Sequence, residues 1–141
     1  MDSKSTIASL LLRLGLGFTF LSAVAARLGL WQDGSGWNEF LEYTASVNSF
    51  AAKELIPFLA VAATVIEILI GLMLILGFKT RFAAFGATGL TLLFALTMSY
   101  SFGLRSAFDY SVFVDCTASF LLATISDYKW SLDQVINKKV A

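Results

Sequence analysis

Long apolar runs alternate with short polar segments along this chain. The runs cover residues 7–26, 55–78, 82–104 and 110–126, and the last of them is the shortest. A helix of about 20 mostly apolar residues crosses the hydrocarbon core of a bilayer. The pattern therefore predicts an all-α fold, an integral membrane four-helix bundle, in which residues 1–141 form a single transmembrane domain.

The longest polar segment, residues 27–54, is net negative and rich in aromatic residues. Within it Trp37, Phe40, Leu41 and Thr44 follow helical spacing. Tryptophan and tyrosine rings are favoured at the headgroup layer of a membrane. We expect a short interfacial helix here, in the first extracytoplasmic loop, which serves either as an inert anchor or as a lid over a site between the helices.

Basic residues predict the orientation of the chain in the membrane. The N-terminal segment, the loop that holds Lys79 and Arg81, and the C-terminal tail all carry lysine or arginine, whereas residues 27–54 are acidic. Positively charged loops stay on the cytoplasmic side. We therefore expect a multi-pass protein of the inner (cytoplasmic) membrane with both termini in the cytoplasm.

The composition agrees with a membrane protein and limits the classes of molecule that the protein is expected to bind. Hydrophobic residues make up 57% of the chain and charged residues 14%, against about 25% charged in a soluble domain. The mean hydropathy is +0.77. The formal net charge is zero, so no basic surface indicates nucleic acid. The expected surroundings are membrane lipid and either other subunits of a membrane complex or further copies of this chain.

The chain has no histidine and one cysteine, Cys116. These counts exclude histidine-ligated haem, cysteine-ligated iron–sulfur clusters and Cys/His zinc sites within the chain. They also exclude an intramolecular disulfide relay. We expect no metal, and since no pair of nucleophile and base is apparent either, a stand-alone enzyme is the least favoured class.

Glu67 is the one charged residue inside the second run, residues 55–78. An ionised carboxylate at bilayer depth costs at least a few kcal/mol, so it usually faces a partner or a wet cavity. Small residues share its helical face and leucine and isoleucine fill the opposite face. Glu67 is therefore expected to point into protein, as a functional group or as a structural contact between helices.

Two further charges lie inside the other runs: Arg13 in the first and Asp115 in the last. At 1.5 Å per residue, Arg13 lies about 10 Å from the cytoplasmic boundary and Asp115 about 10 Å from the outer one. Our hypothesis is that Arg13 pairs with Glu67 and that Asp115 lies above them as a protonatable group. Arg13 reaching back to the near boundary, and three purely structural charges, are the alternatives. If the charges are functional, Arg13, Glu67 and Asp115 are the candidate cofactor-binding residues, able to pass protons or to hold the polar head of a quinone.

Several motifs resemble those of the DoxX family of small four-helix membrane proteins. They are the run from Leu12 to Gly17, the later basic position Arg27, the stretch from Glu67 through Gly71 and Gly77 to Arg81, and the stretch from Asp109 to Asp115. The resemblance extends over roughly residues 7–127. It implies the four-helix fold and, for some members, a role as the small subunit of a thiosulfate:quinone oxidoreductase-like complex.

The resemblance leads to three function hypotheses. The first is an accessory subunit of a quinone-linked or other redox membrane complex, with quinone as the candidate cofactor. The second is a non-catalytic anchor or assembly subunit of a larger complex. The third is a small-molecule or ion transporter, which would need a homo-oligomer because four helices enclose a narrow interior. We favour the first.

Overall fold

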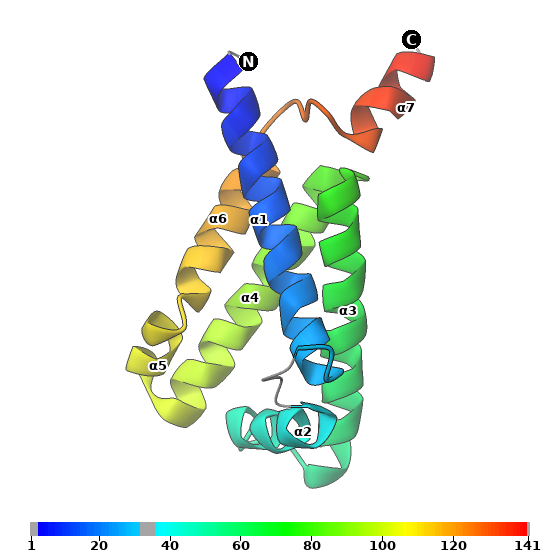
Figure 1. The fold of residues 1–141 in the computed structure, drawn as a ribbon. Coiled ribbons are helices and arrows are strands. Elements are labelled where there is room, and N and C mark those ends of the chain that lie inside the picture. The colour runs from blue at the N-terminus through cyan, green and yellow to red at the C-terminus, as the bar shows by residue number, and fades with distance from the viewer. Residues whose placement is uncertain (1–2, 32–35, 141) are drawn as a thin grey trace.

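The computed structural model describes residues 3–31 and 36–140, with no side-chain description for residues 137–140. This part of the chain is helical and contains no strand, and the start of α1 and helix α7 lie at the same end of the molecule (Figure 1). Its elements are α1 (Ser3–Arg27), α2 (Gly36–Val47), the 3₁₀ turn η1 (Lys53–Leu55), α3 (Ile56–Leu76), α4 (Thr80–Phe102), α5 (Leu104–Asp109), α6 (Val112–Thr124) and α7 (Leu132–Val140).

Within the described residues, three helices are long and apolar enough to cross a membrane: α1, η1 with α3, and α4. They match the first three predicted runs to within a few residues. The fourth run, residues 110–126, contains only the 13-residue helix α6, about 20 Å long at 1.5 Å per residue. Ser111 at φ 57° separates α6 from α5, and extended backbone at Ile125 ends it.

Helices α1 and α3 cross closely because glycines meet at their contact. A Cβ added to Gly17 would lie 3.1 Å from the carbonyl oxygen of Gly71, and one added to Gly71 would lie 3.2 Å from the carbonyl oxygen of Gly17. Two backbones approach this closely only where side chains are absent. The contact sets the antiparallel register of α1 on α3, and Leu16, Phe20 and Leu74 are buried in the adjoining core.

Helix α4 packs most extensively against α6. The Cys116 thiol of α6 donates to the carbonyl oxygen of Thr88 at 3.6 Å, and Thr91 and Ala95 of α4 are buried. The leucines at Leu90 and Leu122 join the same apolar core as the α1–α3 crossing. Helix α6 therefore packs closely on a stretch of α4 that carries small side chains.

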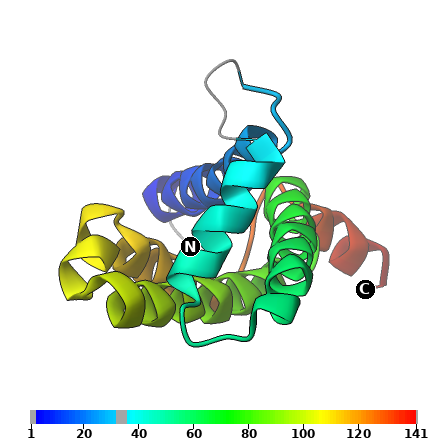
Figure 2. The same ribbon diagram turned by 90° about the horizontal axis from the view of Figure 1, so that it is seen from below.

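Two elements close the ends of the bundle. Helix α2 crosses one end, as the view from below shows (Figure 2), and the helix predicted around Trp37–Thr44 is thus present. Helix α7 lies at the other end, beside the loop between α3 and α4 (Figure 1), where the N–H of Asp133 donates to the carbonyl oxygen of Gly77 at 2.9 Å. There the Asp133 carboxylate accepts from the backbone N–H groups of Lys79 at 2.6 Å and Thr80 at 2.8 Å, which caps the start of α4.

Candidate functional site

Glu67 lies inside the protein, as its sequence context predicts. Only 2% of the residue is exposed, and Ala60, Thr64 and Gly71 on the same face of α3 are also buried. The residues on the opposite face are exposed toward the surroundings of the bundle; they are Ile66, Leu69, Leu72 and Leu76. A carboxylate in this position needs a partner to offset the loss of its hydration.

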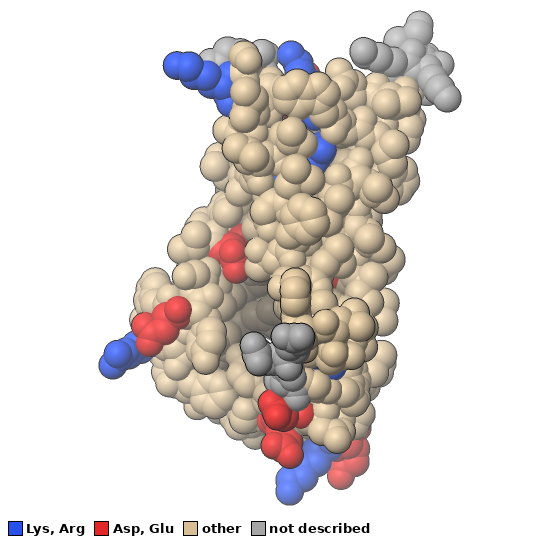
Figure 3. Space-filling model, viewed as in Figure 1, with Lys and Arg blue, Asp and Glu red and all other residues tan. Residues whose placement is uncertain are grey.

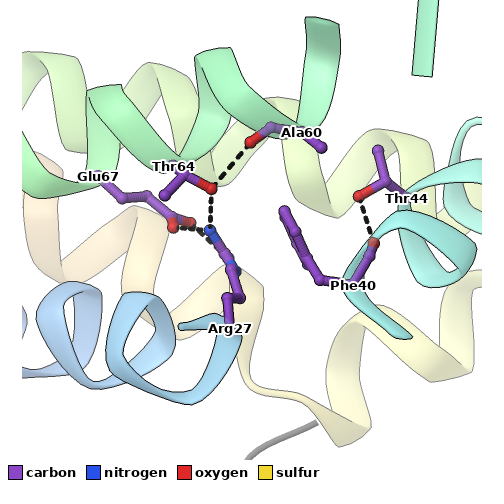
Figure 4. Close-up of polar contacts among 6 residues, drawn as sticks. All are labelled: Arg27, Phe40, Thr44, Ala60, Thr64 and Glu67. Atoms are coloured by element: carbon purple, nitrogen blue, oxygen red, sulfur yellow. Dashed lines mark hydrogen bonds and ion pairs between the residues drawn. The ribbon is translucent and has the colours of Figure 1, made fainter. Parts of the chain in front are cut away.

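The partner is Arg27, the last residue of α1. Its Nη2 donates to Oε1 of Glu67 at 3.1 Å, and its Nη1 donates to Oε2, so the pair is bidentate (Figure 4). The two side chains are 12% and 3% exposed. Two parallel charge-assisted hydrogen bonds combine strength with a defined orientation. The pair joins the end of α1 to the middle of α3.

Further contacts surround this pair. The Thr64 hydroxyl donates to the carbonyl oxygen of Ala60 at 2.8 Å and accepts from Nη1 of Arg27 at 3.4 Å. The Phe40 ring of α2 lies over the guanidinium, with its centroid 3.9 Å from Cζ of Arg27 (Figure 4). A cation over an aromatic face is attracted by the ring's electrons. Helix α2 thus covers the ion pair.

The predicted pair between Arg13 and Glu67 does not form. Because Gly17 meets Gly71 in antiparallel register, residues before Gly17 lie beside residues after Gly71. The Arg13 side chain accordingly lies beside Gly77, ten residues beyond Glu67 and about 15 Å away along a helix. The expected pair rested on the depth of each residue below the end of its own apolar run. Such depths do not tell how two helices are aligned along their axes.

Arg13 instead holds the C-terminal tail. It is 2% exposed, and its Nη2 donates to the carbonyl oxygen of Trp130 at 2.8 Å. Its Nε has no hydrogen-bond partner among the described residues. The expectation that Arg13 shares a site with Glu67 is therefore corrected: Arg13 lies at the end of the bundle that α7 closes.

A cavity of about 460 Å³ lies beside the ion pair. Its walls are mostly apolar side chains of α1, α2, α3, α4 and α6, and both Arg27 and Glu67 line it. The face drawn in Figure 3 is hollowed between α6 and α2, two of the elements that line the cavity. Ile66 and Leu93, which are 42% and 56% exposed, also line it, so part of the cavity wall is formed by side chains that reach the outer surface of α3 and α4.

Asp115 lines the same cavity, together with Tyr43 and Tyr110. Its carboxylate is half-buried and makes no ion pair or hydrogen bond within the part of the chain that the structure describes. Burial and the neighbouring Tyr110 raise the pKa of the Tyr43 phenol, while Arg27 lowers it. A phenol is protonated at neutral pH in any case, so the Tyr43 hydroxyl can donate a hydrogen bond into the cavity.

Two of the three predicted residues, Glu67 and Asp115, thus line one cavity, and Arg13 does not. The depths of the charged residues within the apolar runs did not identify Arg27 as the partner of Glu67. A usable signal was present, since α1 ends on the side of the bundle where α3 begins, and a long basic side chain at that end can reach toward the middle of α3. The family resemblance had also marked Arg27 as a basic position.

Comparison with known proteins identifies a family for this chain. The DoxX family model matches residues 8–100, a range that includes Arg13, Arg27 and Glu67 but not Asp115. Neither the curated proteins nor the solved structures give a significant match. The matched range covers α1 to α4 up to Tyr100, and so most of the cavity.

Proposed function

Because this chain belongs to the DoxX family, we propose that it is an accessory subunit of a quinone-linked redox complex. It is a multi-pass membrane protein, and lipid is its immediate surroundings. In this proposal the cavity beside the Arg27–Glu67 pair takes up the head of a quinone. In the same proposal the catalytic oxidoreductase itself is a partner subunit.

The observation that carries the proposal is the chemical character of the cavity. A quinone head is a flat apolar ring with two carbonyl oxygens that accept hydrogen bonds. The apolar walls suit the ring, and the hydroxyls of Tyr43 and Tyr110 supply donors that make no hydrogen bond to the described residues. The side chains present therefore fit such a group.

The route into the cavity also suits a lipophilic ligand. Ile66 of α3 and Leu93 of α4 are part of the wall and are exposed on the outside of the bundle. An isoprenoid tail can leave the cavity between these helices and lie among the acyl chains.

Each polar residue has a defined task in this proposal. When bound, a quinone supplies two-electron, two-proton redox chemistry. Tyr43 donates a hydrogen bond to a carbonyl oxygen of the ligand, and the free carboxylate of Asp115 takes up or releases a proton beside it. The Arg27–Glu67 pair forms a rigid part of the cavity wall. Both groups stay ionised there because each offsets the charge of the other.

The proposal includes a location in the inner membrane with both termini in the cytoplasm. It is supported by the start of α1 and helix α7 lying at one end of the bundle (Figure 1) and by Lys79 and Arg81, which line one groove with Asp133 of α7. Helix α2 then lies at the outer surface of the membrane as an interfacial helix, and α6 completes a fourth crossing. Cysteines placed at Lys4 and in α2 of a Cys116→Ser protein should react with an impermeant thiol reagent from opposite sides of the membrane.

A structural feature favours one other function, the non-catalytic anchor. Arg27 and Glu67 satisfy each other directly, and an ion pair of this kind can serve only to fix the position of two helices. An anchor would bind partner subunits without binding quinone. Both functions can therefore be distinguished by whether the cavity is occupied by quinone in the purified complex.

The test fills the cavity without altering its charges. Ala63 lines the cavity, whereas Val65 of the same helix is 49% exposed and lies outside it. The protein is purified in mild detergent as Ala63→Phe, as Val65→Phe and unaltered, and the quinone in its lipid extract is quantified. We expect quinone with the unaltered protein and with Val65→Phe, and at least about a tenfold loss with Ala63→Phe, which corresponds to about 1.4 kcal/mol.

If partner subunits co-purify with all three proteins and no quinone is found, the anchor function replaces the proposal. Quinone that is retained equally by Ala63→Phe would show that it binds elsewhere. The melting temperature of each variant is recorded in parallel, so that loss of the fold is distinguished from loss of the ligand.

A further inference from the structure

A second and more open groove, of about 750 Å³, lies at the end of the bundle opposite α2. It runs between the first turn of α4, residues 126–128 after α6, and the start of α7. Arg81 fixes one side of it by donating from Nη2 to the carbonyl oxygen of Ile125 at 3.1 Å. The groove shares no lining residue with the cavity beside Glu67.

The floor of this groove is aromatic and faces outward. Phe78, Phe82 and Phe85 line it and are 38%, 73% and 48% exposed. These residues belong to a membrane-spanning helix and to the turn before it. Large apolar side chains on the outside of such a helix lie against acyl chains. The floor is therefore continuous with the lipid-facing surface of α4.

The rim of the groove carries both signs of charge. Lys79 and Arg81 supply two cations, and Asp127 and Asp133 supply two carboxylates. Asp133 is already engaged, because it accepts from the backbone N–H groups of Lys79 and Thr80. Asp127 is exposed, and its side chain makes no ion pair or hydrogen bond among the described residues. The rim thus carries two cationic groups and two carboxylates, of which Asp127 makes no hydrogen bond or ion pair among the described residues.

We propose that this groove binds a phospholipid with a phosphoethanolamine headgroup. The phosphate lies between Lys79 and Arg81, the ammonium group donates to Asp127, and the acyl chains follow Phe82 and Phe85 along α4. Arginine and lysine are the usual ligands of phosphate oxygens. An ammonium with N–H groups satisfies the free carboxylate, which a choline headgroup cannot do by hydrogen bonding.

The charge pattern selects this lipid over an anionic one. Phosphatidylglycerol would satisfy Lys79 and Arg81 but would leave Asp127 facing a lipid that carries no cation. A site for anionic lipid would be expected to carry basic residues alone. The paired charges of a zwitterionic headgroup match the paired charges of the rim.

The test is native mass spectrometry of the full chain in mild detergent, titrated with phosphatidylethanolamine, phosphatidylcholine and phosphatidylglycerol that carry identical acyl chains. We expect phosphatidylethanolamine to bind about tenfold more tightly than either of the others, a difference of about 1.4 kcal/mol. Asp127→Asn should remove the preference over phosphatidylcholine. Lys79→Asn should weaken the binding of all three lipids; asparagine suits the left-handed backbone at this position, where φ is 45°.

The matched control is Asp109→Asn, which removes an exposed carboxylate outside the groove and should leave the lipid preference unchanged. Equal or tighter binding of phosphatidylglycerol would overturn the proposal, as would a preference that survives Asp127→Asn. A chain that retains none of the three lipids would overturn it as well. The quinone content of the same samples is measured separately, because the groove and the cavity are distinct.

Discussion

Arg27 and Glu67, 40 residues apart in the chain, face each other with two terminal nitrogens against two carboxylate oxygens. The pair sits at the point where α1 ends and α3 has passed through about half of its length. Phe40 covers the guanidinium from α2. Three elements that the sequence separates by polar loops are thus joined at one charged contact, which also forms part of the cavity wall.

Removing one member of this pair should destabilise the protein strongly. Arg27→Met leaves the carboxylate of Glu67 buried without its partner, which costs about 3–5 kcal/mol for a buried pair. The unfolding free energy, or the melting temperature in detergent, measures the effect. Arg105→Met is the control: it breaks an ion pair with Asp109 whose side chains are 91% and 61% exposed, and it should change little.

Glu67→Gln should cost less than Arg27→Met because the neutral amide can still accept a hydrogen bond from Arg27. If Arg27→Met is as stable as the unaltered protein, the ion pair does not hold α1 on α3.

Substitution of Gly17 should loosen the crossing of α1 on α3. A Cβ at this position would lie 2.7 Å from the side chain of Ile75 and 3.1 Å from the carbonyl oxygen of Gly71. Gly17→Ala is therefore expected to destabilise by about 1–3 kcal/mol. Gly15→Ala, in the same helix, meets nothing within 4 Å and should be neutral or stabilising by about 0.5–1 kcal/mol. Thermal unfolding of the two variants in the same detergent makes the comparison, and equal melting temperatures would contradict it.

Loss of the Asp133 carboxylate should expose the start of α4. Asp133→Ala removes the acceptor for the N–H groups of Lys79 and Thr80, and the loss of an N-terminal cap costs about 0.5–2 kcal/mol. Hydrogen exchange should increase in peptides that cover residues 79–81, while those in α3 keep their protection. Asp133→Asn retains one oxygen acceptor and should give an intermediate rate. Unchanged exchange in Asp133→Ala would show that water replaces the cap without loss.

Removal of the Phe40 ring should weaken the hold of α2 on the bundle. Phe40→Leu keeps an apolar side chain but loses the cation–π contact, worth about 0.5–2 kcal/mol. Hydrogen exchange in α2 should become faster, and Phe40→Trp should restore the slow rate. The control is Phe50→Leu, which removes an exposed ring that contacts Tyr100 instead. A fast rate in both Phe40→Leu and Phe40→Trp would mean that shape, and not the aromatic contact, holds α2.

The helices and the inward direction of Glu67 were predictable because both follow from local patterns. An apolar run of the right length forms a helix in a membrane whatever surrounds it, since its backbone groups must be paired internally. Small residues beside Glu67 and large apolar ones opposite it likewise set which face turns inward. Both predictions are confirmed by the burial of Glu67 and the bounds of α1, α3 and α4.

That α6 is shorter than the apolar run in which it lies was harder to predict from the sequence. An apolar run from residue 110 to residue 126 gives no sign that Ser111 adopts a left-handed backbone conformation at φ 57°. A serine enters that conformation only when surrounding contacts offset its cost. In the structure the Ser111 N–H donates to the carbonyl oxygen of Phe108 at 2.9 Å, and the Ser111 carbonyl oxygen accepts from the N–H of Asp115 at 3.1 Å, so this residue forms the break between α5 and α6.

The sequence by itself determined that this chain is a helical membrane protein of the DoxX family with one carboxylate held inside its second span. Only the tertiary structure decided which cation meets that carboxylate. The contact of Gly17 with Gly71 sets the register of two antiparallel helices, and that register places Arg27 at Glu67 and Arg13 at Trp130. Periodicity specifies which face of a helix turns inward, but the axial position of one helix against another depends on side-chain packing between segments far apart in the chain.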